Sequence, residues 1–410
     1  MNTAEDQAMN VSVGPFSGQF SQLSRRLEDE AQGVWAVHDR ACERFESGED
    51  VYLLSVGDPD LPTPPRVVQA GIDALHKGRT HYAPGRGEPC LRQTIADIET
   101  RASGKPCDPD EVVVFPGATN AIYSVLATLV NPGEGVVVAE PMYIGYEGIF
   151  RALDIRKQSF DLDADGGFAF SLAAVEAAIT PETRVVMVNT PGNPAGNVIA
   201  EADLRALADI CRERGLWLIC DEVYSMITFD APHVSLRRAA ASLDNVIIID
   251  GLSKSHAMTG WRLGWSVTSR ALADRLLDFT SSTIFGCCQF VQDAAAFALT
   301  NDEEYIQGVR EEYRVRRDYV CERVAAIPGL QCQVPAAGMF VMIDVRAIAA
   351  DGTVFAQRLL DAAGVSVLPG LGFGENCRGY VRVSLAQPIN VLRPAFDRIA
   401  AFVAETEGKS

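Results

Sequence analysis

The sequence predicts an α/β protein of three layers, α/β/α, in which a mostly parallel central sheet lies between helices, together with a smaller α+β domain. The first observation behind this prediction is an alternation of short apolar runs with helical patterns between Glu111 and Val267. The second is that these runs lack polar alternation, which is typical of strands buried on both faces of a parallel sheet. The third is the length of 410 residues, which is too long for one small core.

The first part of the chain leads into this pattern. Residues 1–20 are small and polar and are expected to form a mobile arm, and a helical pattern follows from Leu23 to Glu46. A strand that starts at Val51 runs into a proline-rich segment ending at Pro65, which cannot be helical. Two more helices are predicted, at Arg66–His76 and Glu88–Ser103.

The alternating region supplies the central sheet. Its predicted strands are residues 112–115, 136–139, 184–188, 216–220, 246–249 and 263–267. Its predicted helices are residues 119–129, 143–153 and 202–214. Because ligands of such sheets bind beyond the carboxyl ends of the strands, polar residues that directly follow a strand are candidates for the site.

The pattern changes after Arg270. Helices are predicted at residues 271–279, 303–326, 353–363 and 391–405, and strands at 339–345, 365–368 and 380–385. We therefore expect an N-terminal arm and helix over residues 1–50 that join the small domain, a large ligand-binding domain over 51–290, and a small α+β domain over 291–410.

Composition excludes several classes of function. A net charge of −18 and a pI of about 4.7 argue against a nucleic-acid partner, which needs basic surfaces. The chain shows no signal-peptide pattern and no apolar run of the roughly 20 residues that span a bilayer. Ten scattered cysteines indicate reduced thiols in a cytoplasmic protein, and five dispersed histidines suggest no metal site.

The stretch from Asp250 to Trp265 carries the most specific chemical signal. It presents Ser253 and Lys254 after a buried strand, and Arg262 follows eight residues after the lysine. The amine can form an imine with a carbonyl compound, while the hydroxyl and the guanidinium can bind its phosphate. A surface loop with an ordinary lysine is the alternative. The stretch resembles the Ser-x-Lys…Gly-x-Arg-x-Gly signature of the class I and II aminotransferases, which implies a fold-type-I enzyme whose large domain binds pyridoxal 5'-phosphate.

Two segments that follow earlier strands fit the same cofactor. Pro116–Asn120 lies between a strand and a helix, where free N–H groups and the helix dipole suit a phosphate. The resemblance implies that Ala118 and Thr119 bind the cofactor phosphate; a turn capped by Thr119 is the alternative. Tyr143 can stack on a flat ring and matches the family's ring-stacking aromatic, although it could equally be a packed aromatic.

Two further segments match the ring of the cofactor. Asn193 lies in a turn, Asn189–Gly196, that is similar to the family's Asn-Pro-x-Gly turn, and the resemblance implies a hydrogen bond to the 3-oxygen of the pyridine. Asp221 at a buried strand end is costly unless it is paired, and the protonated ring nitrogen is a suitable partner. Tyr224 can reach the 3-oxygen. The alternatives are an Asx turn around Asn193 and a turn capped by Asp221.

Three residues point to the substrate and to a second subunit. Arg382 lies inside an apolar strand, and a buried arginine needs an anionic partner, which the resemblance implies is the α-carboxylate of the amino acid. An internal salt bridge is the alternative. Gly57 matches the position whose backbone approaches that carboxylate. Tyr82 matches a tyrosine that reaches the neighbouring subunit's phosphate, so the resemblance implies a homodimer with shared active sites.

The matching motifs run in order from Gly57 to Arg382 and cover over three-quarters of the chain. One position departs from the family, which often has a hydroxyl residue where Gly251 stands. A phosphate contact is then missing or is replaced by a water, and a slightly lower affinity for the cofactor is expected. The glycine-dense Pro369–Gly374 is interpreted as a substrate-side loop, because no helix of a βαβ unit follows it.

The predicted reaction is the transfer of an amino group between an amino acid and a 2-oxo acid. Lys254 is the predicted general base, and Asp221 and Tyr224 complete the catalytic set. An aspartate-specific enzyme commonly takes an arginine from the segment after the lysine, and residues 280–293 contain none. Two longer stretches, Leu252–Arg262 and Gly338–Arg346, look like those of arginine–pyruvate aminotransferases, so a basic donor is expected, either arginine or a non-proteinogenic amino acid derived from it.

Some alternatives stay open at this point. A β-elimination lyase of the same fold shares every cofactor residue, and an aminotransferase for aromatic or neutral amino acids fits the same motifs. A cofactor-sensing regulator would need a DNA-binding module, and the N-terminal arm is too short and too acidic for one. Glu28, Asp29 and Glu30 are candidates for the carboxylate that binds a basic side chain, although such residues more often form a solvated face.

Overall fold

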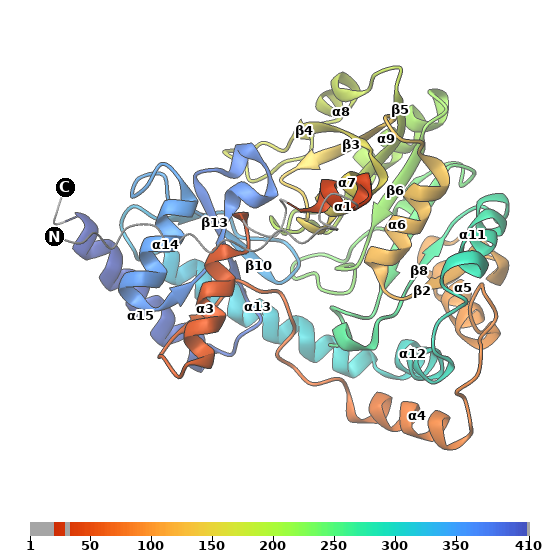
Figure 1. Ribbon diagram of the computed structural model, residues 1–410, viewed down its shortest axis with the longest axis horizontal. Helices are drawn as coiled ribbons and strands as arrows, with labels where there is room; N and C mark the ends of the chain where they lie inside the picture. Colours follow the sequence, from red (N-terminus) through yellow and green to blue (C-terminus); the bar gives the residue numbers. More distant parts are fainter. Residues whose placement is uncertain (1–19, 29–32, 408–410) are drawn as a thin grey trace.

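A seven-stranded sheet forms the centre of the computed structural model, which describes residues 20–28 and 33–407 (Figure 1). Only β8 runs antiparallel to its neighbours, and the remaining pairs are parallel. In spatial order the strands are β2 (Val112–Phe115), β8 (Gly264–Val267), β7 (Val246–Gly251), β6 (Trp217–Asp221), β5 (Thr183–Asn189), β3 (Gly135–Glu140) and β4 (Arg156–Asp161). The predicted mostly parallel sheet between two layers of helices is confirmed.

Helices cover both faces of this sheet because successive strand residues point to opposite sides. In β2, Val112 and Val114 pack into one apolar core, whereas Val113 and Phe115 pack into another. The first core is covered by α5 (Pro89–Ser103), α8 (Leu172–Ala178), α9 (Glu201–Glu213), α10 (Leu236–Ala239) and α12 (Gln289–Asn301), with α4 (Pro65–His76) packed on α12. The second is covered by α6 (Ala118–Leu129), α7 (Gly145–Leu153) and α11 (Arg270–Thr283).

A smaller α+β unit lies beside the central sheet (Figure 1). Its antiparallel sheet has the order β12 (Leu368–Pro369), β13 (Tyr380–Ser384), β10 (Phe340–Asp344) and β9 (Gln331–Cys332). A parallel pair joins β1 (Tyr52–Leu53) to β11 (Val365–Ser366). The surrounding helices are α3 (Ala36–Glu46), α13 (Glu303–Ala325), α14 (Gly352–Ala363) and α15 (Ile389–Glu407).

The boundary between the two units stays a prediction. We propose that the larger unit extends to Asn301 rather than to residue 290, because α12 packs against α4 and α5. The N-terminal helix α3 packs on α14 and β11, which supports its assignment to the smaller unit.

The helix predicted from Leu23 to Glu46 is wrong as a single element. The chain forms α1 (Gln22–Leu27) and a separate α3, with bends at Val34 and Trp35 between them. The reason is that α1 packs against α7 of the larger unit while α3 packs on the smaller one, and a straight helix could not reach both. Arg26 fixes α1 there, since its Nε donates to Arg151 O at 2.7 Å and its Nη2 to Ala152 O at 3.1 Å. Residues 1–19 of the predicted arm lie outside the described residues.

Several elements were not predicted, among them β4, α8, α10, α12 and the two-residue strand β9. The edge strand β4, sequence RKQSFD, is largely exposed and has no apolar run to mark it. Helix α12 is rich in alanine and phenylalanine on several faces, so its sequence lacks a polar side and a clear helical period. Helices α8 and α10 span only seven and four residues. Within residues 20–28 and 33–407, no helix is both long and apolar enough to cross a bilayer.

Arg316 on α13 ties the smaller unit to the chain segment that enters the larger one. Its side chain is only 2% exposed, and its Nη1 and Nη2 donate to the two carboxylate oxygens of Asp60 at 2.7 and 3.0 Å. Nη1 also donates to Leu385 O at 2.9 Å. A buried guanidinium with this many partners is expensive to disrupt, because the groups left behind stay desolvated.

We predict that Arg316→Ala lowers the free energy of unfolding by about 2 kcal/mol or more, because it leaves the buried Leu385 carbonyl and the partly exposed Asp60 carboxylate without their donor. Arg314→Ala is the matched control, since Arg314 lies on the same helix and pairs with Glu311 and Asp318 at the surface. Its loss should cost less than about 1 kcal/mol. Urea unfolding followed by circular dichroism measures both, and equal losses would contradict the role given to Arg316.

Candidate active site

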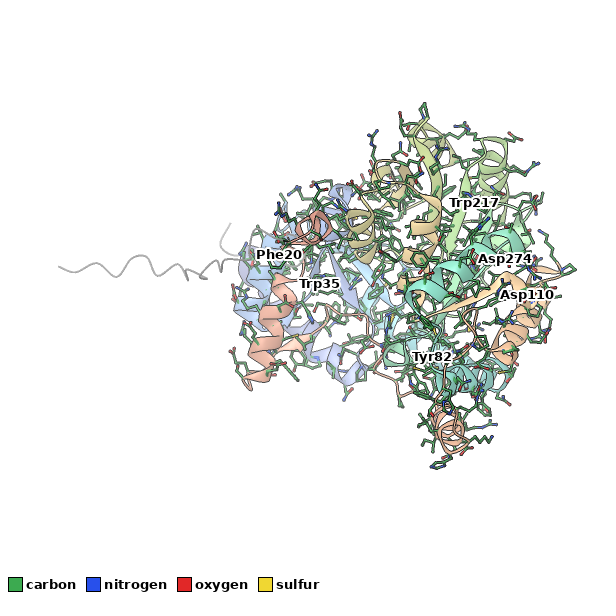
Figure 2. All side chains as sticks on the ribbon, turned by 45° about the vertical axis from the view of Figure 1, so that its right-hand side comes forward. Phe20, Trp35, Tyr82, Asp110, Trp217 and Asp274 are labelled. Atoms are coloured by element: carbon green, nitrogen blue, oxygen red, sulfur yellow. The ribbon has the colours of Figure 1, made fainter. Side chains whose placement is uncertain are left out.

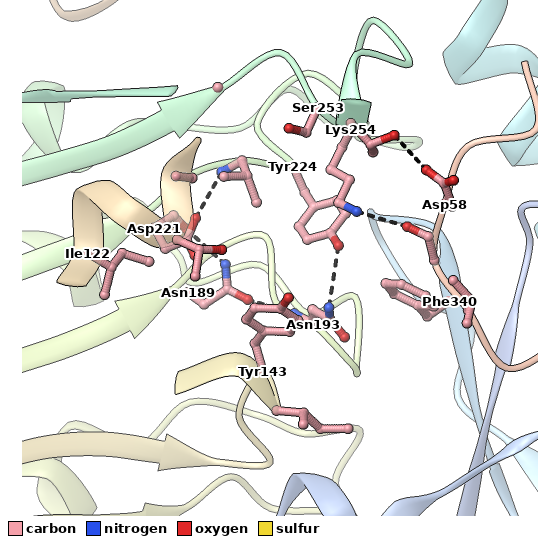
Figure 3. A pocket seen from close by; sticks show the side chains of 18 of the residues that line it. Asp58, Ile122, Tyr143, Asn189, Asn193, Asp221, Tyr224, Ser253, Lys254 and Phe340 are labelled. Atoms are coloured by element: carbon pink, nitrogen blue, oxygen red, sulfur yellow. Dashed lines mark hydrogen bonds between the residues drawn. The ribbon is translucent and has the colours of Figure 1, made fainter. Parts of the chain in front are cut away.

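A cavity of about 560 Å³ lies where the two units meet, at the carboxyl ends of the parallel strands (Figure 3). All the predicted site residues except Tyr82 line it. They are Gly57, Ala118, Thr119, Tyr143, Asn193, Asp221, Tyr224, Ser253, Lys254, Arg262 and Arg382. The chain therefore brings together residues that are up to 325 positions apart in the sequence, from Gly57 to Arg382.

Lys254 follows β7 and projects its amine into this cavity. Its Nζ donates to Gly57 O at 2.8 Å (Figure 3). Burial lowers the pKa of Lys254 from 10.5 to about 8; the negative charge of Asp58 opposes this shift, and the positive charges of Arg382 and Arg262 add to it. A larger fraction of neutral amine is thus present near pH 7 than for an exposed lysine, and the neutral amine is the nucleophile and the base.

Asp221 ends β6 at the opposite side of the view in Figure 3 from Asp58. Tyr146 Oη donates to its Oδ2 at 2.5 Å, and the Val223 N–H donates to its Oδ1 at 3.2 Å. Burial raises the pKa of Asp221 to about 6, and the two hydrogen bonds only partly offset that rise. Among the described residues no cationic side chain forms an ion pair with it. The buried carboxylate is suited to a positively charged group of a ligand.

Arg382 in β13 is a buried positive charge, whereas Asp221 is a buried negative one. Its Nη1 donates to Asn193 Oδ1 at 3.0 Å and its Nη2 to Ser55 O at 2.8 Å, so both oxygens it reaches are neutral. The rings of Phe340 and Phe373 pack at 3.9 and 4.8 Å from the guanidinium carbon. Burial lowers the pKa of Arg382 to about 10. Within the part of the chain that the structure describes, no carboxylate pairs with Arg382, so an anionic ligand group is the partner it lacks.

Asn193 and Tyr224 meet inside the cavity, as expected for two groups that serve one acceptor. The Asn193 Nδ2 donates to Tyr224 Oη at 3.3 Å (Figure 3). Asn189 fixes the turn, because its Oδ1 accepts the Asn193 N–H at 2.7 Å and its Nδ2 donates to Asp221 O at 3.0 Å. Tyr143 lines the same cavity and packs edge-to-face on Tyr146, with 5.3 Å between the ring centroids.

The amino end of α6 forms a close-fitting cradle. A Cβ atom on Gly117 would lie 2.6 Å from Arg262 Nη2, and one on Gly264 would lie 2.5 Å from Ala118 N. The backbone N–H groups of Ala118 and Thr119 have no acceptor among the described residues, because they begin the helix. Arg262 adds a guanidinium whose Nη1 is held by Thr259 O at 2.7 Å. Free N–H groups and a positive charge at a helix end suit a phosphate.

The departure at Gly251 has a steric reason. Gly251 pairs with Gly264 in the sheet, and a Cβ at Gly251 would lie 2.9 Å from Leu263 O and 3.2 Å from Gly264 Cα. A serine or threonine there would force the strands apart, so a hydroxyl contact to the phosphate is replaced by close backbone packing.

These features fit pyridoxal phosphate group by group. The cradle suits its phosphate, the unpaired Asp221 suits its protonated ring nitrogen, and Asn193 with Tyr224 suits its 3-oxygen. Lys254 lies within the same cavity with its partly neutral amine.

Tyr82 is the predicted residue that the structure keeps out of this cavity. Its side chain is 84% exposed (Figure 2), and its ring packs against Phe285 with 5.6 Å between the centroids. Its contact with a neighbouring subunit stays a prediction. Among the acidic candidates for a basic side chain, Glu28 is exposed after α1 and does not line the cavity, whereas Asp29 and Glu30 lie outside the described residues.

Sequence reasoning missed several residues of the cavity. Trp35 and Phe340 line it, as does Asp58, and Tyr146 holds Asp221. Asp58 directly follows Gly57, so its position had a local signal. Trp35 had none, because it lay within a helix predicted to be continuous. Tyr146 lies three residues after Tyr143, but only the fold shows that it reaches Asp221 in β6.

Comparison with known proteins agrees with this geometry. The family model described as "Aminotransferase class I and II" matches residues 49–399. The arginine–pyruvate transaminase AruH of Pseudomonas aeruginosa is 44% identical over 391 residues, which cover 95% of this chain and all of that protein. The aspartate/prephenate aminotransferase of Thermus thermophilus is 33% identical and covers 92% of this chain and 98% of its own length.

Solved structures show the same architecture. The aspartate aminotransferase of Thermus thermophilus with maleate superposes with a TM-score of 0.88 and 33% identity over 93% of this chain and all of that one. The aromatic aminotransferase of Pyrococcus horikoshii gives a TM-score of 0.84 and 30% identity over 90% of this chain and 99% of that one.

We predict that the cofactor-free protein condenses with pyridoxal phosphate at a rate that rises with pH through about 8 and then levels off. The sign follows from the lowered pKa of Lys254, since its neutral form attacks the aldehyde and is nearly complete above that pH. Stopped-flow absorbance of the lysine-bound cofactor measures the rate. Lys254→Ala should show no such change, and a rate in the wild type that still climbs toward pH 10.5 would contradict the assigned environment.

Proposed function

The chain belongs to the class I and II aminotransferases and is a pyridoxal-phosphate-dependent transaminase, and from this premise we propose that it moves an amino group from arginine or a related basic amino acid to a 2-oxo acid such as pyruvate. The similarity to an arginine–pyruvate transaminase along nearly the whole of both chains carries this proposal. Amino acids derived from arginine that keep a guanidino group belong to the same proposed class.

In the proposed site the cofactor and the protein side chains have separate chemical roles. When bound, pyridoxal phosphate supplies an aldehyde that takes up the amino group and a ring that withdraws electrons from the α-carbon of the donor. The Asp221 carboxylate, oriented by Tyr146, keeps the ring nitrogen protonated, and each pKa unit of that effect corresponds to about 1.4 kcal/mol. Ala118, Thr119, Ser253 and Arg262, which line the cavity, would hold the phosphate, and Tyr143 would pack on the ring.

Lys254 is the proposed proton carrier. Its Nζ would take the proton from the α-carbon of the donor and deliver it to the aldehyde carbon of the cofactor. The lowered pKa of Lys254 suits this proton transfer near neutral pH. Gly57 O, which accepts the hydrogen bond from Nζ at 2.8 Å, keeps the amine on the substrate side of the cavity.

Arg382 is the proposed anchor for the α-carboxylate of both substrates. Its guanidinium is buried, packs against the rings of Phe340 and Phe373, and is kept in place by Asn193 and Ser55. A carboxylate supplies the charge that these neutral partners do not. Because donor and acceptor share this group, one arginine can serve both half-reactions.

We also propose a homodimer whose subunits share their active sites. Two aromatic side chains, Tyr82 and Phe285, are 84% and 62% exposed and pack on each other at the surface. Helix α4 presents Val68, Ile72 and Leu75 to the outside at helical spacing. An apolar surface of this kind indicates a protein interface rather than a solvated face.

A cytoplasmic location is proposed because the cysteines are free thiols.

We predict that arginine converts the bound cofactor to its amine form in a spectral screen of single amino acids, whereas aspartate does so poorly. The chain lacks an arginine in residues 280–293 for a second carboxylate. Lys254→Ala should keep cofactor bound noncovalently and lose turnover with pyruvate. A screen in which aspartate or phenylalanine outperforms every basic amino acid would refute the donor proposal. Release of pyruvate and ammonia from a cysteine conjugate without an oxo acid would instead indicate a lyase.

The shared-site proposal predicts complementation between two impaired variants. Lys254→Ala is expected to be inactive alone, because it lacks the amine, and Tyr82→Ala is expected to be weakly active, because it lacks the contact lent to its partner. Refolded together in equal amounts, they should recover about one quarter of wild-type turnover, because half of the dimers then carry one complete site. No recovery, with mixed dimers shown to form by mass spectrometry, would mean that Tyr82 serves its own subunit.

A further inference from the structure

One charged side chain of the cavity has no task in the chemistry described so far. Among the described residues, the charged groups that line the cavity are Asp58, Asp221, Lys254, Arg262 and Arg382. The cofactor accounts for Asp221, Lys254 and Arg262, and the α-carboxylate of the substrate accounts for Arg382. Asp58 is left, and it is an anion in a cavity proposed to receive a cationic side chain.

The carboxylate of Asp58 lines the cavity and is open to solvent. Thr259 Oγ1 donates to its Oδ1 at 2.7 Å, and Oδ2 has no partner in the part of the chain that the structure describes. Figure 3 shows Asp58 and Asp221 on opposite sides, with Lys254 and Tyr224 between them. Asp58 therefore lies on the side of the cavity away from the carboxylate proposed to bind the ring nitrogen, and its neighbours connect it with the substrate region.

The α-carboxylate anchor links Asp58 to this substrate region. Asp58 follows Gly57, and the ring of Phe340 packs so closely on Gly57 that a Cβ there would lie 2.2 Å from Phe340 Cζ. The same ring covers one face of the Arg382 guanidinium at 3.9 Å. A donor whose carboxylate binds Arg382 thus starts next to the loop that carries Asp58.

Trp35 is connected to the anchor through Phe373. It lines the cavity and packs with Ile144, Leu368 and Phe373, and the ring of Phe373 lies 4.8 Å from the guanidinium carbon of Arg382. Trp35 sits between α1, which Arg26 fixes on α7, and α3, which packs on the smaller unit. The packing of these two helices holds the indole at the cavity wall. Indole is the side chain whose ring face binds cations best.

We propose that Asp58 and Trp35 form the subsite for the guanidinium or ammonium group of the donor side chain. This subsite depends on the proposed function, in which the donor is a basic amino acid. Asp58 supplies the opposite charge through Oδ2, and Trp35 supplies an aromatic wall. The subsite would explain a preference for basic donors without a role for Glu28, Asp29 or Glu30.

A rival role for Asp58 is purely electrostatic, since its charge also raises the pKa of Lys254. That role affects every donor equally because every donor needs the same amine. A side-chain subsite affects cationic donors alone. The comparison of arginine with citrulline separates the two, because citrulline has the same length and a neutral end group.

The test uses Asp58→Asn in the holoenzyme, which keeps the size of the side chain and an acceptor for Thr259. We expect kcat/KM for arginine to fall about tenfold or more and that for citrulline to change less than about twofold. Trp35→Leu should reduce the arginine preference about threefold, and Trp35→Phe should restore most of it. Glu28→Gln, which removes an acidic charge outside the cavity, is the matched control and should change neither substrate.

Ligand binding gives a readout that does not depend on turnover. By calorimetry, 5-guanidinopentanoate, which is arginine without its α-amino group, should bind the wild type about tenfold more tightly than hexanoate, and Asp58→Asn should remove that difference. The wild-type comparison remains valid even where a variant folds poorly. Equal losses for arginine and citrulline, or an unchanged guanidino preference in Asp58→Asn, would overturn the subsite while leaving the arginine proposal intact. A wild type that transaminates citrulline better than arginine would overturn the donor proposal and the subsite together.

Discussion

The structure depends on two buried charges that have no ionic partner among residues 20–28 and 33–407. Within these ranges Asp221 receives a tyrosine hydroxyl and a backbone N–H, and Arg382 reaches an amide and a carbonyl oxygen. Each would be expensive in a closed interior, and the cost is offset when a ligand brings the opposite charge. A cationic ring nitrogen at one end and a carboxylate at the other meet both needs, so the chain is built around the pair formed by cofactor and amino acid.

The fold keeps these charges apart and in the same cavity. Asp221 ends a strand of the parallel sheet, whereas Arg382 lies in the antiparallel sheet of the smaller unit. The segment from Val51 to Pro65 and the bend at Trp35 cross between the units, and they bring Gly57, Asp58 and an indole to the cavity. The position of the substrate therefore depends on how the units pack, which Arg316 and Asp60 help to fix.

The sequence revealed the site residues that stand out from their neighbours along the chain. It did not reveal those that reach the cavity through contacts between distant elements. Lys254, Asp221 and Arg382 each stand out because a polar group ends or interrupts an apolar strand. Trp35 gave no such signal, because its place follows from α1 and α3 packing on different units, and neither contact is local. The edge strand β4 was missed because it is largely exposed and has no apolar run. Helix α12 was missed because it is apolar on several faces, so its sequence lacks a clear helical period.

Asp221 is held ready for a positive ring nitrogen. The ¹⁵N chemical shift of ring-labelled pyridoxal phosphate, bound to the wild type and to Asp221→Asn, measures this most directly. We expect a protonated nitrogen in the wild type up to pH 8 and beyond, and its loss in the variant, where the partner charge is gone. A nitrogen that is unprotonated in the wild type, or equally protonated in both proteins, would contradict it.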